Sequence, residues 1–210
     1  MKLNQVEVTE KLLEINTIKI QPNNPFTWAS GWKSPIYCDN RKILSYPETR
    51  TFIRDQFVSV IREKYPQAEV IAGVATGAIA IGALVAEQLG LPFIYVRSKP
   101  KGHGLENLIE GDLKPFQKVV IIEDLVSTGI SSLKAAEAVN NFGGDVVGMV
   151  SIFTYNFPLA KENFKKAGIE LTSLSRYQIL IDLSLEKGEI TKDQMESLME
   201  WREDPANWGK

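Results

Sequence analysis

The stretch that decides the fold spans residues 119–131 and reads VVIIEDLVSTGIS. It opens with four β-branched apolar residues, a pattern typical of a strand buried on both faces in a parallel sheet. Two adjacent carboxylates follow, Glu123 and Asp124, and then a small turn that leads into an alanine-rich helix. We expect the strand at 119–122. The two acids then lie at its carboxyl end, where open α/β sheets bind ligands.

The turn after the acids is a candidate anion site. It supplies hydroxyl groups and backbone N–H groups at a helix start, where negative charge is favoured, and its residues are Ser127, Thr128, Gly129, Ile130 and Ser131. Gly129 permits a positive φ and close approach of a ligand. A ligand that occupied both acids and turn would carry ribose-like hydroxyls beside a phosphate. The alternative is a plain strand end, with acids placed near a helix N-terminus for dipole reasons.

Strands and helices alternate along most of the chain. Strands are expected at 70–73, 93–96, 119–122, 146–153 and near Leu171, and helices at 8–15, 47–64, 77–89, 131–141, 158–167, 177–185 and from Thr191 to Trp201. This alternation predicts the α/β class, with a mainly parallel, twisted sheet flanked by helices. We expect a single domain over residues 1–210. Its α/β core spans about 46–185, and residues 1–45 together with the C-terminal helix form a small hood.

Composition narrows the class of protein. The chain has 210 residues, a formal net charge of −2, 44% hydrophobic and 24% charged residues, as in ordinary globular proteins. No broad basic surface is expected, so nucleic acid is not the expected partner. The chain has one cysteine, Cys38, and neither an N-terminal apolar segment nor an apolar run near the ~20 residues of a membrane span. We expect no membrane partner and a cytoplasmic location.

A second candidate feature is the basic loop at 97–104, which reads RSKPKGHG and follows the strand expected at 93–96. It carries Arg97, Lys99, Lys101 and the only histidine of the chain, His103. The loop continues to about Pro115, and loops of that length tend to be functional lids or disordered segments. The alternative is a solvated charged loop.

Two further segments complete the pattern. Residues 72–78, AGVATGA, form another strand-to-helix turn of small residues, which suits either tight helix packing or a second backbone anion site. Residues 26–41, FTWASGWKSPIYCDNR, are rich in aromatic and hydroxyl side chains. This segment is either an irregular surface hairpin or a cover over a ligand.

These motifs resemble those of the type I phosphoribosyltransferases. Residues 119–131 resemble the family's phosphoribosyl pyrophosphate (PRPP) motif, and residues 97–104 and 26–41 are similar to the loop and N-terminal hood of its orotate-using branch. The resemblance covers roughly residues 26–155. It implies transfer of ribose 5-phosphate from PRPP to orotate, which gives orotidine 5′-monophosphate and pyrophosphate in pyrimidine biosynthesis.

The resemblance also implies roles for individual residues. The catalytic set would be Lys101, His103, Glu123 and Asp124, with the two acids on the ribose hydroxyls. The PRPP set would add Arg97 and the run Leu125, Val126, Ser127, Thr128, Gly129, Ile130 and Ser131. Ser127 would also lie near orotate. Mg²⁺ would be the cofactor, held by PRPP and water without direct protein ligands, and the chain would form a homodimer that shares the 97–104 loop between subunits.

Four positions depart from the pattern. Ser98, Gly77 and Ala29 stand where many or some relatives carry a basic residue, and the strand at 146–153 is followed by Thr154 and Tyr155 without the arginine that some relatives place there. The carboxylate of orotate therefore needs another partner. Lys33, Arg41 and backbone N–H groups are the candidates.

Three other functions are alternatives to phosphoribosyl transfer to orotate. A purine phosphoribosyltransferase would share residues 123–131, and a PRPP-sensing regulator would keep the fold but bind nucleic acid. A nucleotide-binding dehydrogenase is disfavoured, because the turn after the strand at 70–73 lacks the pattern Gly-x-Gly-x-x-Gly.

Overall fold

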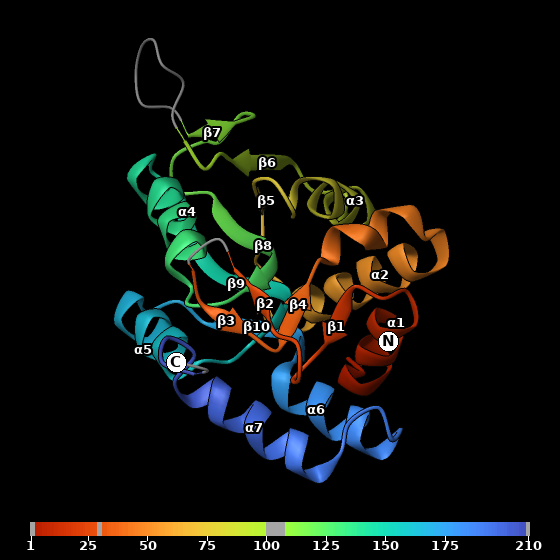
Figure 1. Cartoon of the computed structure of the whole chain (residues 1–210). Helices are drawn as coiled ribbons and strands as arrows, with labels where there is room; N and C mark the ends of the chain where they lie inside the picture. Colours follow the sequence, from red (N-terminus) through yellow and green to blue (C-terminus); the bar gives the residue numbers. More distant parts are fainter. Residues whose placement is uncertain (1–2, 29–30, 100–107, 209–210) are drawn as a thin grey trace.

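A six-stranded sheet forms the centre of the computed structural model, which describes residues 3–28, 31–99 and 108–208. The strand order is β10-β9-β8-β5-β6-β7. Its members are β5 (Val70–Val74), β6 (Phe93–Val96), β7 (Ile109–Glu110), β8 (Lys118–Val126), β9 (Asp145–Thr154) and β10 (Leu171–Arg176). All neighbouring pairs are parallel except β6 with β7. The predicted α/β class is therefore confirmed (Figure 1).

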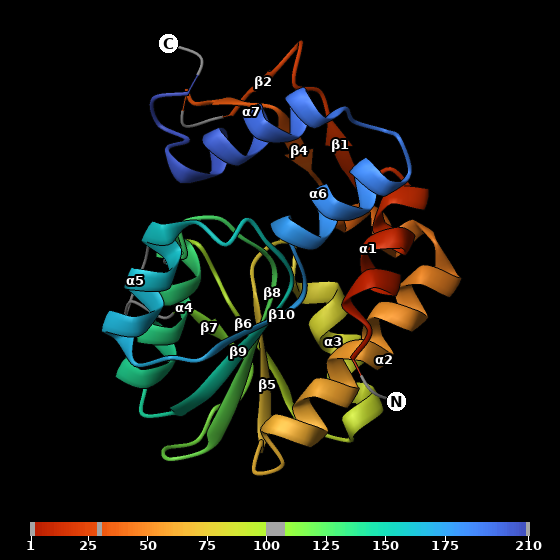
Figure 2. The same cartoon turned by 90° about the horizontal axis from the view of Figure 1, so that it is seen from below.

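Helices cover both faces of the sheet (Figures 1 and 2). One face carries α4 (Ile130–Asn141) and α5 (Pro158–Ala167), and the other carries α1 (Gln5–Glu14), α2 (Pro47–Lys64) and α3 (Ile79–Leu89). The apolar run of β8 alternates between these layers. Val119 and Ile121 pack with α4 and α5, whereas Val120 and Ile122 pack with the opposite layer. A run that is apolar at every position is required because both faces are buried.

The remaining elements lie over the carboxyl ends of the strands (Figure 2). They are two antiparallel pairs, β1 (Ile18–Ile20) with β4 (Ile36–Cys38) and β2 (Phe26–Thr27) with β3 (Lys33–Ser34), the 3₁₀ helix η1 (Asn40–Ser45), α6 (Tyr177–Glu186) and α7 (Lys192–Glu203). Trp201 of α7 is fully buried, and its indole N–H donates to the Lys33 carbonyl at 3.1 Å. The last helix thus holds the N-terminal strands.

An aromatic cluster joins this layer to the end of β9. Its members are Trp28, Phe153, Tyr155, Phe157, Tyr177 and Trp201. Tyr155 stacks on Phe157 at 5.4 Å between ring centroids, and the edge of Trp28 meets Trp201 at 5.6 Å. Such aromatic pairs stabilise the fold by more than the burial of their apolar surface alone. Aromatic residues from four separate parts of the sequence therefore fix the cover on the sheet.

The predicted elements are confirmed in type, with two corrections. The strand expected at 119–122 is wrong in length, because β8 continues to Val126. The longer neighbour β9 keeps pairing with it, so that Glu123 faces Ser151 and Val126 faces Thr154 in register. The antiparallel edge strand β7 was not predicted, since two residues give no periodicity. No helix in the described ranges is long and apolar enough to cross a membrane.

Candidate active site at the switch point of the sheet

The connections after β5 and β8 leave in opposite directions, although these two strands are direct neighbours. The chain after β5 runs through α3 to β6, and the chain after β8 runs through α4 to β9 on the other side. Ligands of open α/β sheets bind at such a switch point. Two turns meet there: the small-residue turn at 75–78 and the hydroxyl turn, Ser127 to Gly129.

The two adjacent acids point to opposite faces, because they lie inside β8 and successive strand residues alternate. Glu123 points toward α4 and is only 4% exposed. Its carboxylate accepts hydrogen bonds from the Ser132 hydroxyl at 2.8 Å and from the Asp124 amide at 2.9 Å. Burial, reinforced by the charge of Asp124, raises the pKa of Glu123 well above its usual range. Burial therefore disfavours the charged form of Glu123.

Asp124 points to the other face, against the small-residue turn. Its carboxylate fills the space beside the α-carbon of Gly77, so that any side chain there would overlap it. The Asp124 carbonyl accepts a hydrogen bond from the Asn40 side chain at 2.7 Å. The strand, the turn after β5 and the N-terminal segment thus converge on Asp124. In the same turn the peptide bond between Ala75 and Thr76 is cis.

The hydroxyl turn is supported on the side of α5. Gly129 has φ +80°, and a methyl group on it would lie 2.7 Å from the Phe164 ring. The Thr128 carbonyl accepts from the Asn163 side chain at 3.0 Å. The side chain of Val126 is fully buried, so this residue offers a ligand only its backbone. Leu125 is half-buried, and Ser131 is exposed at the first turn of α4.

A cavity of about 280 Å³ opens between the ends of β5 and β6 and the start of α4. Its wall includes Ala75, Arg97, Ser98, Ser131 and Lys134. The guanidinium Nη1 of Arg97 lies 3.5 Å from a carboxylate oxygen of Glu110 and donates no hydrogen bond within the described part of the chain. Arg97 therefore lies beside the turns, and its role in binding an anion stays a prediction.

Most of the remaining basic loop lies outside the described residues. Lys101, His103 and Gly104 lie outside the described residues, as does Ala29 in the N-terminal segment. Lys99 is described and exposed. The roles predicted for Lys101 and His103 stay predictions.

The N-terminal segment brings three more polar groups to this edge. Arg41 donates to Asp39 at 2.6 Å, and this hydrogen bond is the main reason that the pKa of Arg41 is raised, with a smaller contribution from the charge of Asp124. Lys33 donates instead to the Thr27 hydroxyl at 3.1 Å. Cys38 is half-buried, and burial together with the Asp124 charge raises the pKa of its thiol. A thiolate nucleophile is not expected there.

Four residues of the site were missed from the sequence. Asn40, Ser132, Asn163 and Phe164 contact the acids or the turn, but none of them was singled out. Asn40 lies within the 26–41 segment, and Ser132 follows the turn directly in the same helix. Asn163 and Phe164 lie outside every motif, so their contacts depend on tertiary packing.

Within the described ranges, no group of three His, Cys, Asp or Glu side chains could hold a metal ion. The Asp124 carboxylate and the hydroxyls of the turn are hard oxygen donors, which suit Mg²⁺ in the presence of phosphate oxygens. The residues present therefore fit an ion carried mainly by a substrate.

A parallel sheet with an acid pair and a hydroxyl turn at its switch point is the arrangement of a phosphoribosyltransferase. The family model described as "Phosphoribosyl transferase domain" matches residues 44–173. The orotate phosphoribosyltransferase of Porphyromonas gingivalis is 60% identical over 202 residues, 96% of each chain, and that of Phocaeicola vulgatus is 58% identical over 99% of this chain and 98% of its own.

Solved structures agree. The crystal structure of orotate phosphoribosyltransferase from Aeropyrum pernix superposes with a TM-score of 0.75 at 26% identity, and the match covers 87% of this chain and 98% of that one. The chain belongs to the phosphoribosyltransferase family and, within it, to the orotate phosphoribosyltransferases. The resemblance stated from the motifs is thereby confirmed.

Proposed function

We propose that the protein transfers ribose 5-phosphate from PRPP to N1 of orotate, with release of pyrophosphate. The new bond joins N1 to C1 of the ribose, the bond from C1 to the pyrophosphate oxygen breaks, and the proton of N1 passes to pyrophosphate or solvent. The observation that carries the proposal is the convergence on Asp124: the acid, the small-residue turn and the N-terminal segment meet at one point. The relatives named above carry the same activity in their names.

The two acids would have different tasks. As the bond to pyrophosphate breaks, positive charge develops on the ribose, and the carboxylate of Asp124 would stabilise this charge and fix a ribose hydroxyl. Glu123 would contact the ribose from the α4 side, where its hydrogen bond to Ser132 holds it in place. We assign the stabilisation of the developing charge to Asp124, because its carboxylate lies at the small-residue turn, whereas Glu123 is buried on the α4 side.

The hydroxyl turn would bind the 5′-phosphate of PRPP. Thr128, Gly129 and Ser131 would donate through hydroxyl and backbone N–H groups at the start of α4, where the helix dipole favours an anion. Arg97 would bind pyrophosphate oxygens from the neighbouring cavity. Lys101 and His103 are proposed to stabilise or protonate the leaving pyrophosphate. Closure of residues 97–104 over the site would exclude water that could hydrolyse PRPP.

Orotate would lie between Ser127 and the N-terminal segment. We propose Arg41 as the partner of its carboxylate, because the charge of Asp124 acts on the Arg41 guanidinium, whereas Lys33 donates to the Thr27 hydroxyl. Arg41→Ala should raise the KM for orotate about tenfold and leave the KM for PRPP within twofold, as expected when one charged hydrogen bond is lost. Lys33→Ala is the matched control, since it removes an exposed cation from the same segment.

We propose Mg²⁺ as the cofactor, bound chiefly by PRPP and water. When bound, it would neutralise charge on the pyrophosphate and orient it. The test is chelation: EDTA should abolish turnover, and added MgCl₂ should restore it. Turnover that persists in EDTA would contradict the assignment.

The function is tested with purified protein, PRPP and MgCl₂, and with orotate, adenine, hypoxanthine and uracil offered separately. Loss of orotate absorbance together with pyrophosphate release is the expected result. Pyrophosphate release with a purine alone would assign a different base. No turnover with any base, together with binding of nucleic acid on a filter, would favour a PRPP-sensing regulator.

We propose a homodimer in which residues 97–104 reach the partner's site. A Lys101→Ala chain mixed with an Asp124→Asn chain should then recover activity, because one of the two mixed sites has both residues intact. If no activity returns although the mixed dimer forms, each site is built from one subunit. The single-domain division with its hood and the cytoplasmic location stay predictions.

A further inference from the structure

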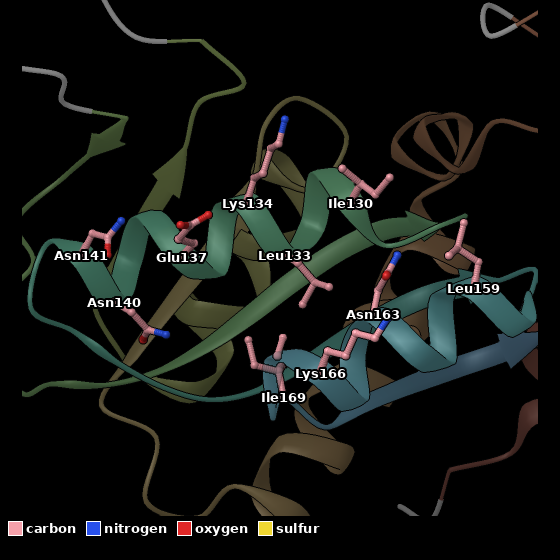
Figure 3. A pocket seen from close by; sticks show the side chains of 11 residues that line it. Ile130, Leu133, Lys134, Glu137, Asn140, Asn141, Leu159, Asn163, Lys166 and Ile169 are labelled. Carbon is pink, nitrogen blue, oxygen red and sulfur yellow. The ribbon is translucent and has the colours of Figure 1, made fainter.

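The hydroxyl turn has one contact that its own sequence does not explain. Asn163, in the middle of α5, directs its side-chain amide to the Thr128 carbonyl, with 3.0 Å between Nδ2 and the oxygen. Figure 3 shows Asn163 on α5, with its side chain directed toward the start of α4. The contact crosses 35 residues of sequence. The turn and α5 are therefore tied at the peptide unit that joins Thr128 to Gly129.

That peptide unit is trans, so its carbonyl and its N–H point in opposite directions. Because the Thr128 carbonyl is directed at α5, the Gly129 N–H is directed away from α5. Backbone N–H groups at a helix start bind phosphate only when they point at the ligand. The hydrogen bond from Asn163 therefore sets the orientation of a donor in the proposed phosphate site.

Gly129 makes this orientation easy to lose. Its φ is +80°, and glycine adopts positive and negative φ with similar ease. Rotation of the Thr128–Gly129 peptide unit by about half a turn would thus be tolerated by the backbone itself. After such a rotation the carbonyl oxygen would face the phosphate and repel it.

Neighbouring carbonyl groups accept hydrogen bonds from other donors. The Val126 carbonyl accepts from both the Thr154 hydroxyl and the Tyr155 amide, each at 3.2 Å. The Gly129 carbonyl accepts from the Leu133 amide at 2.9 Å, as the first hydrogen bond of α4. For the Thr128 carbonyl, the Asn163 amide is the hydrogen-bond donor that the structure gives. Among the described residues, the Thr128 carbonyl therefore depends on a single side chain.

We propose that Asn163 is a positioning residue that holds the Thr128–Gly129 peptide unit with its N–H directed at the 5′-phosphate of PRPP. The inference rests on the proposed phosphate site and adds a residue outside the motif. It predicts that loss of the Asn163 donor weakens PRPP binding and leaves orotate binding and the chemical step nearly unchanged.

Two variants test it. Asn163→Asp keeps the size of the side chain but replaces the donor by an oxygen, and Asn163→Leu removes the donor without adding charge. Both should raise the KM for PRPP about three- to tenfold, the range expected for one hydrogen bond, with kcat and the KM for orotate within twofold of the parent. Asn141→Asp is the control, because Asn141 lies at the other end of α4 in the same groove (Figure 3).

A second readout does not depend on orotate. Titration calorimetry of PRPP with Mg²⁺ should show the same loss of affinity, and the Gly129 amide resonance should shift on phosphate addition in the parent and not in Asn163→Leu. Unchanged PRPP affinity in both variants would overturn the inference. Equal losses for PRPP, orotate and thermal stability would also overturn it, since they indicate general loosening of α5. An inactive parent that still binds PRPP would instead contradict the proposed function.

Discussion

The two turns at the switch point lie side by side, yet they are shaped in opposite ways. The small-residue turn after β5 depends on space, because the Asp124 carboxylate occupies the position beside Gly77. The hydroxyl turn after β8 depends on contacts from behind, because Asn163 and Phe164 of α5 hold its backbone. The structure of the small-residue turn should therefore be disturbed by added atoms. The structure of the hydroxyl turn should be disturbed both by added atoms and by the loss of a hydrogen-bond donor.

This difference separates two kinds of function. Changes in the small-residue turn should act on Asp124 and hence on the charge beside the ribose. Changes around the hydroxyl turn should act on the donors for the phosphate. The chemical step and the binding of PRPP are thus expected to respond to different substitutions, although the two turns belong to one site.

The largest effect is expected from Gly77→Ala. The backbone at Gly77 is not in the left-handed region, so alanine is compatible with the chain, but its methyl group would overlap the Asp124 carboxylate. Because the end of a side chain can rotate away, the fold should be kept while Asp124 leaves its position. We expect kcat/KM for PRPP to fall on the order of 100-fold, as when one charge-stabilising group is removed, with thermal stability nearly unchanged. Steady-state kinetics and thermal unfolding measure the two effects.

Gly90→Asn is the control for Gly77→Ala. Gly90 ends α3 with φ +69° and has open space around its α-carbon, and asparagine tolerates that conformation. Its activity should match the parent. Full activity in Gly77→Ala would mean that the position of Asp124 beside Gly77 is not needed for turnover.

Gly129→Ala should combine a smaller loss of activity with a loss of stability. The residue has φ +80°, and its methyl group would lie 2.7 Å from the Phe164 ring. A non-glycine residue in this conformation costs about 1–2 kcal/mol, which corresponds to a melting temperature lower by roughly 2–8 °C for a chain of this size. The KM for PRPP should rise about tenfold, since a displaced hydroxyl turn loses a phosphate hydrogen bond. A variant with parental melting temperature and kinetics would contradict both parts.

The sequence predicted the fold well because the fold depends on local patterns. The helix at 47–64 and the strand at 93–96 have the bounds that were expected, and Gly90 ends its helix in the left-handed conformation. The last helix begins where it was expected, because Thr191 is its N-cap and forms a capping box with Gln194. Each of these signals lies within a few residues of the feature that it predicts.

The geometry of the site could be predicted only in part. The sequence placed Glu123 and Asp124 beside the turn, but not on opposite faces, because the end of β8 is set by pairing with β9. Asn40 and Asn163 reach the site from elements 84 and 35 residues away. Nothing local to a single asparagine indicates such a contact. The chemistry was therefore readable from the motif, whereas the supports of the motif required the structure.

The variant Glu123→Gln tests how Glu123 affects the pH dependence of the free energy of unfolding. Burial raises the pKa of Glu123 in the folded state, so the folded protein binds a proton more readily than the unfolded chain. Its contribution to stability is thus fully present below the ordinary glutamate pKa of about 4.3. It declines as the pH rises toward the folded pKa, by up to about 1.4 kcal/mol per pH unit. Glutamine removes this decline and keeps the contacts to Ser132 and the Asp124 amide.

The variant should therefore be at least as stable as the parent at pH 8, with a flatter dependence of the free energy of unfolding on pH. Urea unfolding between pH 5 and pH 8 measures this. Glu137→Gln, an exposed position on α4, controls for the loss of one carboxylate. Parallel pH profiles for parent and Glu123→Gln would show that Glu123 is ionised in the folded protein.

The smallest effect on activity is expected from Thr154→Val, and it sharpens the contrast within the hydroxyl turn. Thr154 donates to the Val126 carbonyl at 3.2 Å, but that carbonyl keeps the Tyr155 amide as a second donor. The Thr154 hydroxyl also accepts from the Asn156 amide at 3.0 Å, so two hydrogen bonds of about 0.5–1.5 kcal/mol each are lost from the free energy of unfolding, while the KM for PRPP should stay within twofold of the parent. Thr128 has no such second donor in the described structure, so Asn163 variants should act on PRPP and Thr154→Val should not. A KM for PRPP raised equally by Thr154→Val and Asn163→Leu would mean that the whole turn moves as one unit, and that no single peptide unit is held by α5.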